Sequence, residues 1–209
     1  MKVVIAGATG LVGGKILEIL LQEPKVEKVY AFSRRTQNIS DPKLEWIIGP
    51  LPPEKIPQAE ALILAIGTTM AKAGSQDSFK KTDVEIPYKI AQLAKMDGYQ
   101  QVLSVSAKGA SQKSFLFYNR AKADLENRLI NLAFEKTVFV RPGLLLGERK
   151  ENRPGEKISQ FLFRNLNFML PKSLKAVKAE AVAMALIAGL LSAQNGVQII
   201  ENHKIVEGS

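Results

Sequence analysis

Short apolar runs alternate with amphipathic segments along most of this chain. Period-two or continuous apolar patterns predict strands, and apolar positions three and four residues apart predict helices. The predicted strands are Lys2–Ala6, Lys28–Ser33, Leu44–Ile48, Ala61–Ile66, Gln101–Val105, Thr137–Val140 and Val197–Ile200. The predicted helices are Leu11–Gln22, Asp83–Asp97, Leu116–Phe134, Glu156–Phe168 and Lys178–Ala193. Strands joined by helices are parallel and buried on both faces, so we expect an α/β fold with a doubly wound, mostly parallel sheet.

Local signals support some of these boundaries. Thr82 followed by Glu85 matches a capping box, which predicts that a helix begins at Asp83. Gly98 stands where a helix commonly ends in a left-handed glycine. The segment Gly49–Pro57 holds four prolines and is expected to be a rigid loop. No linker divides the chain, so residues 1–209 are predicted to form one domain.

Composition narrows the class of protein. A chain of 209 residues with 46% hydrophobic residues can bury one core without disulfides or metals. The absence of cysteine excludes cysteine nucleophiles and suits a reducing compartment, and the cytoplasm is the expected location. The first residues are interpreted as a strand that enters a glycine turn rather than as a signal peptide.

Charge and hydropathy address possible partners. The most apolar stretch, Ala181–Leu191, is shorter than the roughly 20 residues of a spanning helix, so no integral membrane segment is expected. The net charge is +9, but the lysines and arginines are scattered and interleaved with acids. No nucleic-acid-binding motif accompanies them. We therefore expect no nucleic acid partner, while a nucleic-acid or membrane-surface binder with salt-sensitive affinity stays open as a rival.

A glycine-rich turn follows the first strand. Gly7, Gly10 and Gly13 are spaced G-x-x-G-x-x-G and lead directly into the Leu11–Gln22 helix. In dinucleotide-binding folds such glycines allow the tight turn, the approach of a pyrophosphate to the backbone, and close helix–strand packing. The free N–H groups at the helix start then bind the anion. A turn that merely joins the two elements is the alternative. We predict an NAD(P)-binding Rossmann-like domain.

The residues after the second strand address the choice of cofactor. Ser33, Arg34 and Arg35 stand twenty residues after Gly13, where an NAD site usually places an acid for the adenosine ribose. Guanidinium groups and a hydroxyl suit a 2′-phosphate instead. NADP(H) is therefore expected in preference to NAD(H), although an arginine pair on an ordinary surface loop would look the same.

A candidate catalytic set lies in the second half. Ser106 follows the predicted strand Gln101–Val105, Tyr118 comes twelve residues later, and Lys122 shares one helical face with Tyr118. Reduction of a carbonyl needs a proton donor, and an ammonium beside a phenol stabilises the phenolate that remains after donation. Lys122 could also hold the nicotinamide ribose, and Ser106 could orient the substrate oxygen. The Y-x-x-x-K pattern alone is weak, and its position after the glycine turn strengthens it.

Three further segments extend the pattern to most of the chain: LAIGTTMAKAGSQDSF (Leu64–Phe79), SVSAKGASQKSFLFYNRAKADLE (Ser104–Glu126) and VRPGLLLGERKENRPGE (Val140–Glu156). With the glycine turn they resemble the short-chain dehydrogenase/reductase superfamily, in particular its atypical branch of oxidoreductases related to the Tat-interacting protein. The resemblance implies an NADP-dependent oxidoreductase that acts on a small carbonyl or alcohol. The alternative is a non-catalytic protein that senses NADP(H) and regulates a protein partner.

The resemblance also implies roles for individual residues. Ser106, Tyr118 and Lys122 take the catalytic positions, and no counterpart is evident for the asparagine that often serves as a fourth member. A short substrate-side segment is expected at about 144–175. The residues implied at the cofactor are Gly7, Thr9, Gly10, Leu11, Val12, Gly13, Ser33, Arg34, Arg35, Leu51, Ala65, Ile66, Gly67, Thr68, Thr69, Tyr118, Lys122, Pro142, Gly143, Leu144 and Leu145.

Other candidates receive ordinary interpretations. His203 is the only histidine and has no second histidine or cysteine beside it, so no metal site is expected. Asp83 and Glu85 are interpreted as favourable charges at a helix start, without chemistry. Phe161–Leu170 could form a partner-binding or membrane-surface helix, although a half-buried core helix is the commoner case.

Overall fold

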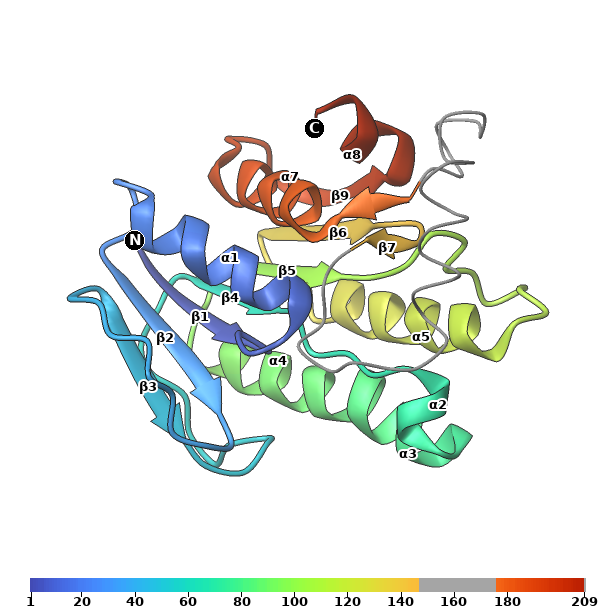
Figure 1. Cartoon of the computed structure of the whole chain (residues 1–209), viewed down its shortest axis with the longest axis horizontal. Helices are drawn as coiled ribbons and strands as arrows, with labels where there is room; N and C mark the ends of the chain where they lie inside the picture. Colours follow the sequence, from blue (N-terminus) through green and yellow to red (C-terminus); the bar gives the residue numbers. More distant parts are fainter. Residues whose placement is uncertain (147–175, 209) are drawn as a thin grey trace.

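The computed structural model describes residues 1–146 and 176–208. A seven-stranded sheet, all parallel, forms its centre in the order β3-β2-β1-β4-β5-β6-β9 (Figure 1). The strands are β1 (Lys2–Ala6), β2 (Lys28–Ser33), β3 (Leu44–Ile48), β4 (Ala61–Leu64), β5 (Gln101–Val105), β6 (Lys136–Arg141) and β9 (Gly196–Glu201). The predicted α/β class and the doubly wound parallel sheet are confirmed.

Helices cover both faces of this sheet. They are α1 (Leu11–Gln22), α2 (Met70–Ala73), α3 (Gln76–Lys80), a π-helical turn η1 (Lys81–Glu85), α4 (Ile86–Met96), α5 (Phe117–Asn131), α7 (Ala179–Leu191) and α8 (Asn202–Glu207). A small second sheet pairs β7 (Leu145–Leu146) with β8 (Val177–Lys178). In Figure 1, α1 and α7 lie on one face of the large sheet and α4 and α5 on the other. The order of strands reverses direction between β1 and β4, where ligands commonly bind at the carboxyl ends.

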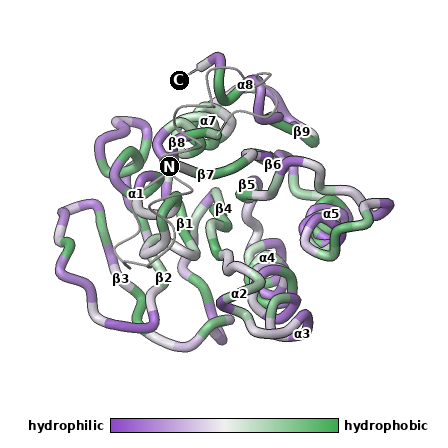
Figure 2. Tube along the Cα trace, turned by 45° about the vertical axis from the view of Figure 1, so that its right-hand side comes forward, coloured by the Kyte–Doolittle hydropathy of each residue, from purple (hydrophilic) through white to green (hydrophobic). Residues whose placement is uncertain are grey.

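Two apolar cores form, one between each face of the sheet and the helices that cover it, because neighbouring strand residues point to opposite faces. Val3 and Ile5 of β1 face α1 and α7, whereas Val4 and Ala6 face α4 and α5. Leu62 and Ile63 of β4 divide in the same way. Figure 2 shows the hydrophobic residues gathered along the central strands and the inner sides of the helices. Strands buried on both faces explain why their sequences are continuous apolar runs.

The helix after β4 differs from its prediction. It does not begin at Asp83: α3, η1 and α4 follow one another without a break from Gln76, and Ser75 caps them, since its Oγ accepts the Ser78 N–H at 3.1 Å. A wider turn at η1 precedes Pro87, whose ring would press on the carbonyl of residue 83 in a regular helix. The predicted end is confirmed, because α4 ends at Met96, Asp97 is its C-cap, and Gly98 comes next with φ of 81°.

No helix within residues 1–146 and 176–208 is long and apolar enough to cross a membrane. Most of the predicted substrate-side segment at about 144–175, the predicted helix Glu156–Phe168 and the candidate surface Phe161–Leu170 lie outside the described residues.

Candidate functional site

The glycine turn joins β1 to α1 at the centre of the sheet. Gly7 has φ of 102°, and a Cβ there would overlap the backbone of Ala65. A Cβ on Gly13 would overlap the carbonyl of Gly7. Neither glycine lines the cavity described below: Gly7 allows the turn to approach the backbone that follows β4, and Gly13 allows α1 to pack closely on the turn. Gly10 is the N-cap of α1 and faces the cavity without a side chain.

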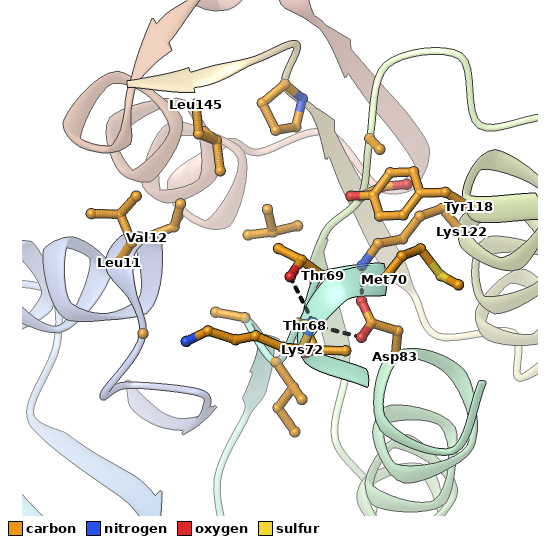
Figure 3. A pocket seen from close by; sticks show the side chains of 18 of the residues that line it. Leu11, Val12, Thr68, Thr69, Met70, Lys72, Asp83, Tyr118, Lys122 and Leu145 are labelled. Atoms are coloured by element: carbon orange, nitrogen blue, oxygen red, sulfur yellow. Dashed lines mark hydrogen bonds and ion pairs between the residues drawn. The ribbon is translucent and has the colours of Figure 1, made fainter. Parts of the chain in front are cut away.

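The start of α1 is suited to an anion. Its first turn contains no acidic residue, and its N-cap residue, Gly10, has no side chain that could cap it. The helix dipole and the first N–H groups therefore remain available to a negatively charged group. Thr9 precedes this helix start, and Leu11 and Val12 are the first residues of α1; all three line the same cavity. Figure 3 shows the side chains of Leu11 and Val12 there. The arrangement fits the pyrophosphate of a dinucleotide.

A cavity of about 870 Å³ lies at the carboxyl ends of β1, β4, β5 and β6. It brings together fifteen of the residues expected from the sequence: Thr9, Gly10, Leu11, Val12, Ala65, Ile66, Gly67, Thr68, Thr69, Ser106, Tyr118, Lys122, Pro142, Gly143 and Leu145. Six lining residues were not expected: Met70, Lys72, Asp83, Val105, Ala107 and Lys108. Gly7, Gly13, Ser33, Arg34, Arg35, Leu51 and Leu144 were expected at the cofactor and do not line it.

The candidate catalytic side chains meet at one side of this cavity. Tyr118 and Lys122 come from α5, and the Lys122 Nζ lies 5.8 Å from the centroid of the Tyr118 ring. The Tyr118 ring packs edge-on against Phe79, with centroids 5.5 Å apart. Ser106, just after β5, is 6% exposed, and its Oγ has no hydrogen-bond partner among residues 1–146 and 176–208. A buried hydroxyl without a partner is unfavourable unless a ligand completes it, so this atom fits a bound carbonyl oxygen.

Asp83, one of the six lining residues that the sequence did not predict, contacts the candidate catalytic set. Its side chain is fully buried, and its Oδ1 forms an ion pair with the Lys122 Nζ at 2.7 Å. The interpretation of Asp83 as a favourable charge at a helix start is therefore wrong, because the helical run begins seven residues earlier, at Gln76. The sequence did hold a signal: Asp83 falls on the stripe of buried residues Phe79, Ile90 and Ala94, where a carboxylate requires a partner.

The turn after β6 is held by polar contacts at the far side of the cavity. Arg141 donates to both carboxylate oxygens of Glu126, at 3.0 and 2.6 Å, and to Glu201 at 2.9 Å. These hydrogen bonds raise the pKa of the Arg141 guanidinium, and the bond to Glu126 is the largest cause. The Gly143 N–H donates to the buried Asn202 side chain at 2.6 Å. The contacts fix Gly143 beside the cavity and tie β6 to α5 and β9.

The loop after β2 lies outside the cavity lining. Arg34 and Arg35 are exposed, and no ion pair to either is present within residues 1–146 and 176–208. The Ser33 hydroxyl is buried and shapes the loop: it donates to the Arg35 carbonyl at 2.7 Å and accepts from the Arg35 N–H at 3.2 Å. Gln37 Nε2 donates to the same hydroxyl at 3.0 Å. Because β2 neighbours β1, this loop begins next to the glycine turn.

Comparison with known proteins places the chain among dinucleotide-binding folds. Residues 2–86 match the family described as "Semialdehyde dehydrogenase, NAD binding domain". The structure is similar to that titled "MoeE5 in complex with UDP-glucuronic acid and NAD", with a TM-score of 0.73 and 16% identity over 95% of this chain and 75% of the other. A likeness at that identity concerns the fold, which is the Rossmann-like fold of nicotinamide-dependent enzymes.

Two fungal proteins are similar in sequence over most of their length. "Protein FMP52, mitochondrial" of Candida albicans is 37% identical over 170 residues, which cover 77% of this chain and 74% of the relative. The protein of the same name from Emericella nidulans is 33% identical over 209 residues, covering 93% of this chain and 89% of the relative. Their names contradict the expected cytoplasmic location. That expectation was wrong because a lack of cysteine is only compatible with a reducing environment and does not distinguish one compartment from another.

Proposed function

The chain belongs to the family of the FMP52 proteins, and from its site we propose that it is an NADP-dependent oxidoreductase that acts on a small carbonyl or alcohol substrate. The observation that carries the proposal is the cavity in which the glycine turn and the side chains of Ser106, Tyr118 and Lys122 meet. The Ser106 hydroxyl supports it: this buried group has no partner in the part of the chain that the structure describes, and a substrate oxygen would complete its hydrogen bonding. We also propose that the chain lies near the Tat-interacting branch of the short-chain dehydrogenases, on the segments Ser104–Glu126 and Val140–Glu156.

Binding of the dinucleotide is assigned to two groups of residues. Gly10 and the N–H groups at the start of α1 would hold the pyrophosphate, while Ala65 to Thr69 would line the cofactor after β4. Arg34 and Arg35 would meet the 2′-phosphate, because each offers a charged fork of donors and neither has an ion pair within the described part of the chain. The preference for NADP over NAD rests on these two arginines.

The reaction divides between cofactor and protein. When bound, the reduced nicotinamide supplies the hydride that adds to the carbonyl carbon. Tyr118 donates a proton to the carbonyl oxygen as that oxygen gains negative charge, and Ser106 donates a hydrogen bond that orients the same oxygen. Lys122 stabilises the phenolate that Tyr118 becomes and offers its other N–H groups to the nicotinamide ribose. In the direction of alcohol oxidation the same groups act in reverse.

The test begins with calorimetric titration of the purified protein with NADPH and NADH side by side. We expect NADPH to bind more tightly. A panel of aldehydes and ketones is then screened for consumption of NADPH, followed by its ultraviolet absorbance. Failure to bind either nucleotide would remove the proposal. Tight binding of NADPH without turnover of any carbonyl would favour the alternative, a protein that senses the cofactor and acts through a protein partner.

A further inference from the structure

The ion pair between Asp83 and Lys122 joins two helices at the wall of the cavity. Asp83 comes from the π-helical turn η1, and Lys122 comes from α5. Their charged atoms are 2.7 Å apart, and their side chains are 0% and 5% exposed. In Figure 3 both side chains point to one place, below Tyr118. The lysine of the candidate catalytic set is thus held by a carboxylate from another element.

The second oxygen of Asp83 holds a different part of the site. Asp83 Oδ2 accepts the backbone N–H of Thr68 at 2.8 Å. Thr68 belongs to the segment after β4 that lines the cavity. The two oxygens of the Asp83 carboxylate therefore connect the Thr68 segment, which is expected to line the dinucleotide, with Lys122, which is expected to bind the nicotinamide ribose. Figure 3 shows both interactions as dashed lines.

Stability does not explain this pair. Removing two charges from water costs several kcal/mol, and an apolar pair of similar volume is commonly as stable or more so. A buried ion pair does fix the positions of its two side chains, because each charge has only one favourable partner where water is excluded. A lysine side chain is long and flexible, and its three N–H donors rotate freely unless one is held. With one donor on Asp83, the other two point in defined directions.

We propose that Asp83 is a positioning residue that aims the Lys122 ammonium at the nicotinamide ribose and couples it to the Thr68 segment. The inference rests on the proposed function, since it needs a dinucleotide in the cavity. Two acceptor oxygens are required, because two donors from separate elements converge on this side chain. An amide has only one acceptor oxygen and would turn an NH₂ group towards either Thr68 or Lys122. Asn is therefore a poor substitute here.

Binding measurements separate this role from a general structural one. NADPH and adenosine 2′,5′-bisphosphate, which lacks the nicotinamide half, are titrated into the wild type, Asp83→Asn, Lys122→Met and the double variant. Asp83→Asn and Lys122→Met are each expected to raise the Kd of NADPH about ten-fold. The double variant is expected to show the same ten-fold loss rather than the hundred-fold product. Adenosine 2′,5′-bisphosphate should change by less than about two-fold in all of them.

Glu85→Gln is the matched control, because it removes a carboxylate from the same π-helical turn at an exposed position. It should leave both affinities unchanged. Three outcomes would each overturn the inference. They are losses of NADPH affinity that multiply in the double variant, an unchanged Kd of NADPH in Asp83→Asn, and equal weakening of the binding of NADPH and adenosine 2′,5′-bisphosphate. If Asp83→Asn does not fold, Lys122→Met and the double variant are compared, and any difference in their NADPH affinity overturns it.

The outcome is distinguishable from failure of the proposed function. A wild type that binds no NADPH removes the function and the inference together. If the wild type binds NADPH but reduces no carbonyl, and the variants show losses of affinity that do not multiply, the role of Asp83 is retained and only the proposed catalysis is removed. Equilibrium binding reports the position of Lys122 without any chemical step.

Discussion

The two ends of the proposed dinucleotide site are built in different ways. At the nicotinamide end, Ser106, Lys122 and Asp83 are buried, and they come from separate elements far apart in sequence. At the adenosine end, Arg34 and Arg35 are exposed on one loop that the Ser33 hydroxyl shapes through contacts within four residues. The first end depends on the whole fold and the second on a short local segment. Changes at the first should therefore alter chemistry and stability together, and changes at the second should alter the choice of cofactor alone.

The largest effect is expected for the phenol at the nicotinamide end. Tyr118→Phe keeps the ring that packs against Phe79 but removes the proton donor. Carbonyl reduction should fall by roughly 100- to 10,000-fold, as expected for loss of a general acid, while the Kd of NADPH stays close to that of the wild type. Initial rates of NADPH consumption and calorimetric titration check the two halves of this prediction.

Tyr88→Phe is the control for that change. Tyr88 lies on α4 outside the cavity lining, where its ring contacts Arg128. Its rate should match the wild type. Turnover in Tyr118→Phe above a tenth of the wild-type rate would show that another group supplies the proton, and the nicotinamide end would lose its proposed acid.

The next effect concerns the glycine turn, which serves both ends. Gly13→Ala would force a methyl group against the carbonyl of Gly7 and displace α1 from the strands. We expect a loss of about 1–3 kcal/mol in the free energy of unfolding and weaker binding of both NADPH and adenosine 2′,5′-bisphosphate. Denaturant unfolding and calorimetry measure these. Gly14→Ala is the control, since its Cβ would lie at an ordinary 3.6 Å from the Ala8 carbonyl.

The sequence predicted the secondary structure around the site better than the side-chain contacts within it. Glycines at fixed spacing and continuous apolar strands are local signals, so the turn and the parallel sheet followed from them. Ser106 and Tyr118 were chosen from the spacing of Tyr118 and Lys122 and from the family resemblance, and the structure adds that they line one cavity. Asp83 could not be placed this way, because its partners Lys122 and Thr68 lie 39 and 15 residues away. The apparent capping box at Thr82 also competed with the true cap at Ser75, and only the buried stripe that includes Phe79 distinguishes them.

At the adenosine end, the double variant Arg34→Ala/Arg35→Ala should alter the choice of cofactor. Loss of charged hydrogen bonds to a phosphate is expected to raise the Kd of NADPH by roughly ten- to a hundred-fold and to leave that of NADH unchanged. Both residues are exposed, so the free energy of unfolding should stay within about 0.5 kcal/mol of the wild type. Parallel titrations with the two nucleotides and a thermal melt measure this.

Lys25→Ala/Lys89→Ala removes the same number of exposed positive charges elsewhere and serves as the control. If that control weakened NADPH as much as the arginine variant does, the effect would come from net charge rather than from a 2′-phosphate site. An equal loss of NADPH and NADH affinity in the arginine variant would likewise count against the preference for NADP.

The smallest effect is expected for Ser33→Ala. The hydroxyl holds the backbone of Arg35 and the Gln37 side chain, so its loss should loosen the loop without removing either guanidinium. Each such hydrogen bond contributes about 1 kcal/mol, and part of it is replaced by water. We expect the Kd of adenosine 2′,5′-bisphosphate to rise about three- to five-fold, with the rate of carbonyl reduction at saturating NADPH unchanged. A large fall in that saturated rate would mean that the two ends are coupled through the strands, because a change confined to the Ser33 loop would then reach Tyr118 across the sheet.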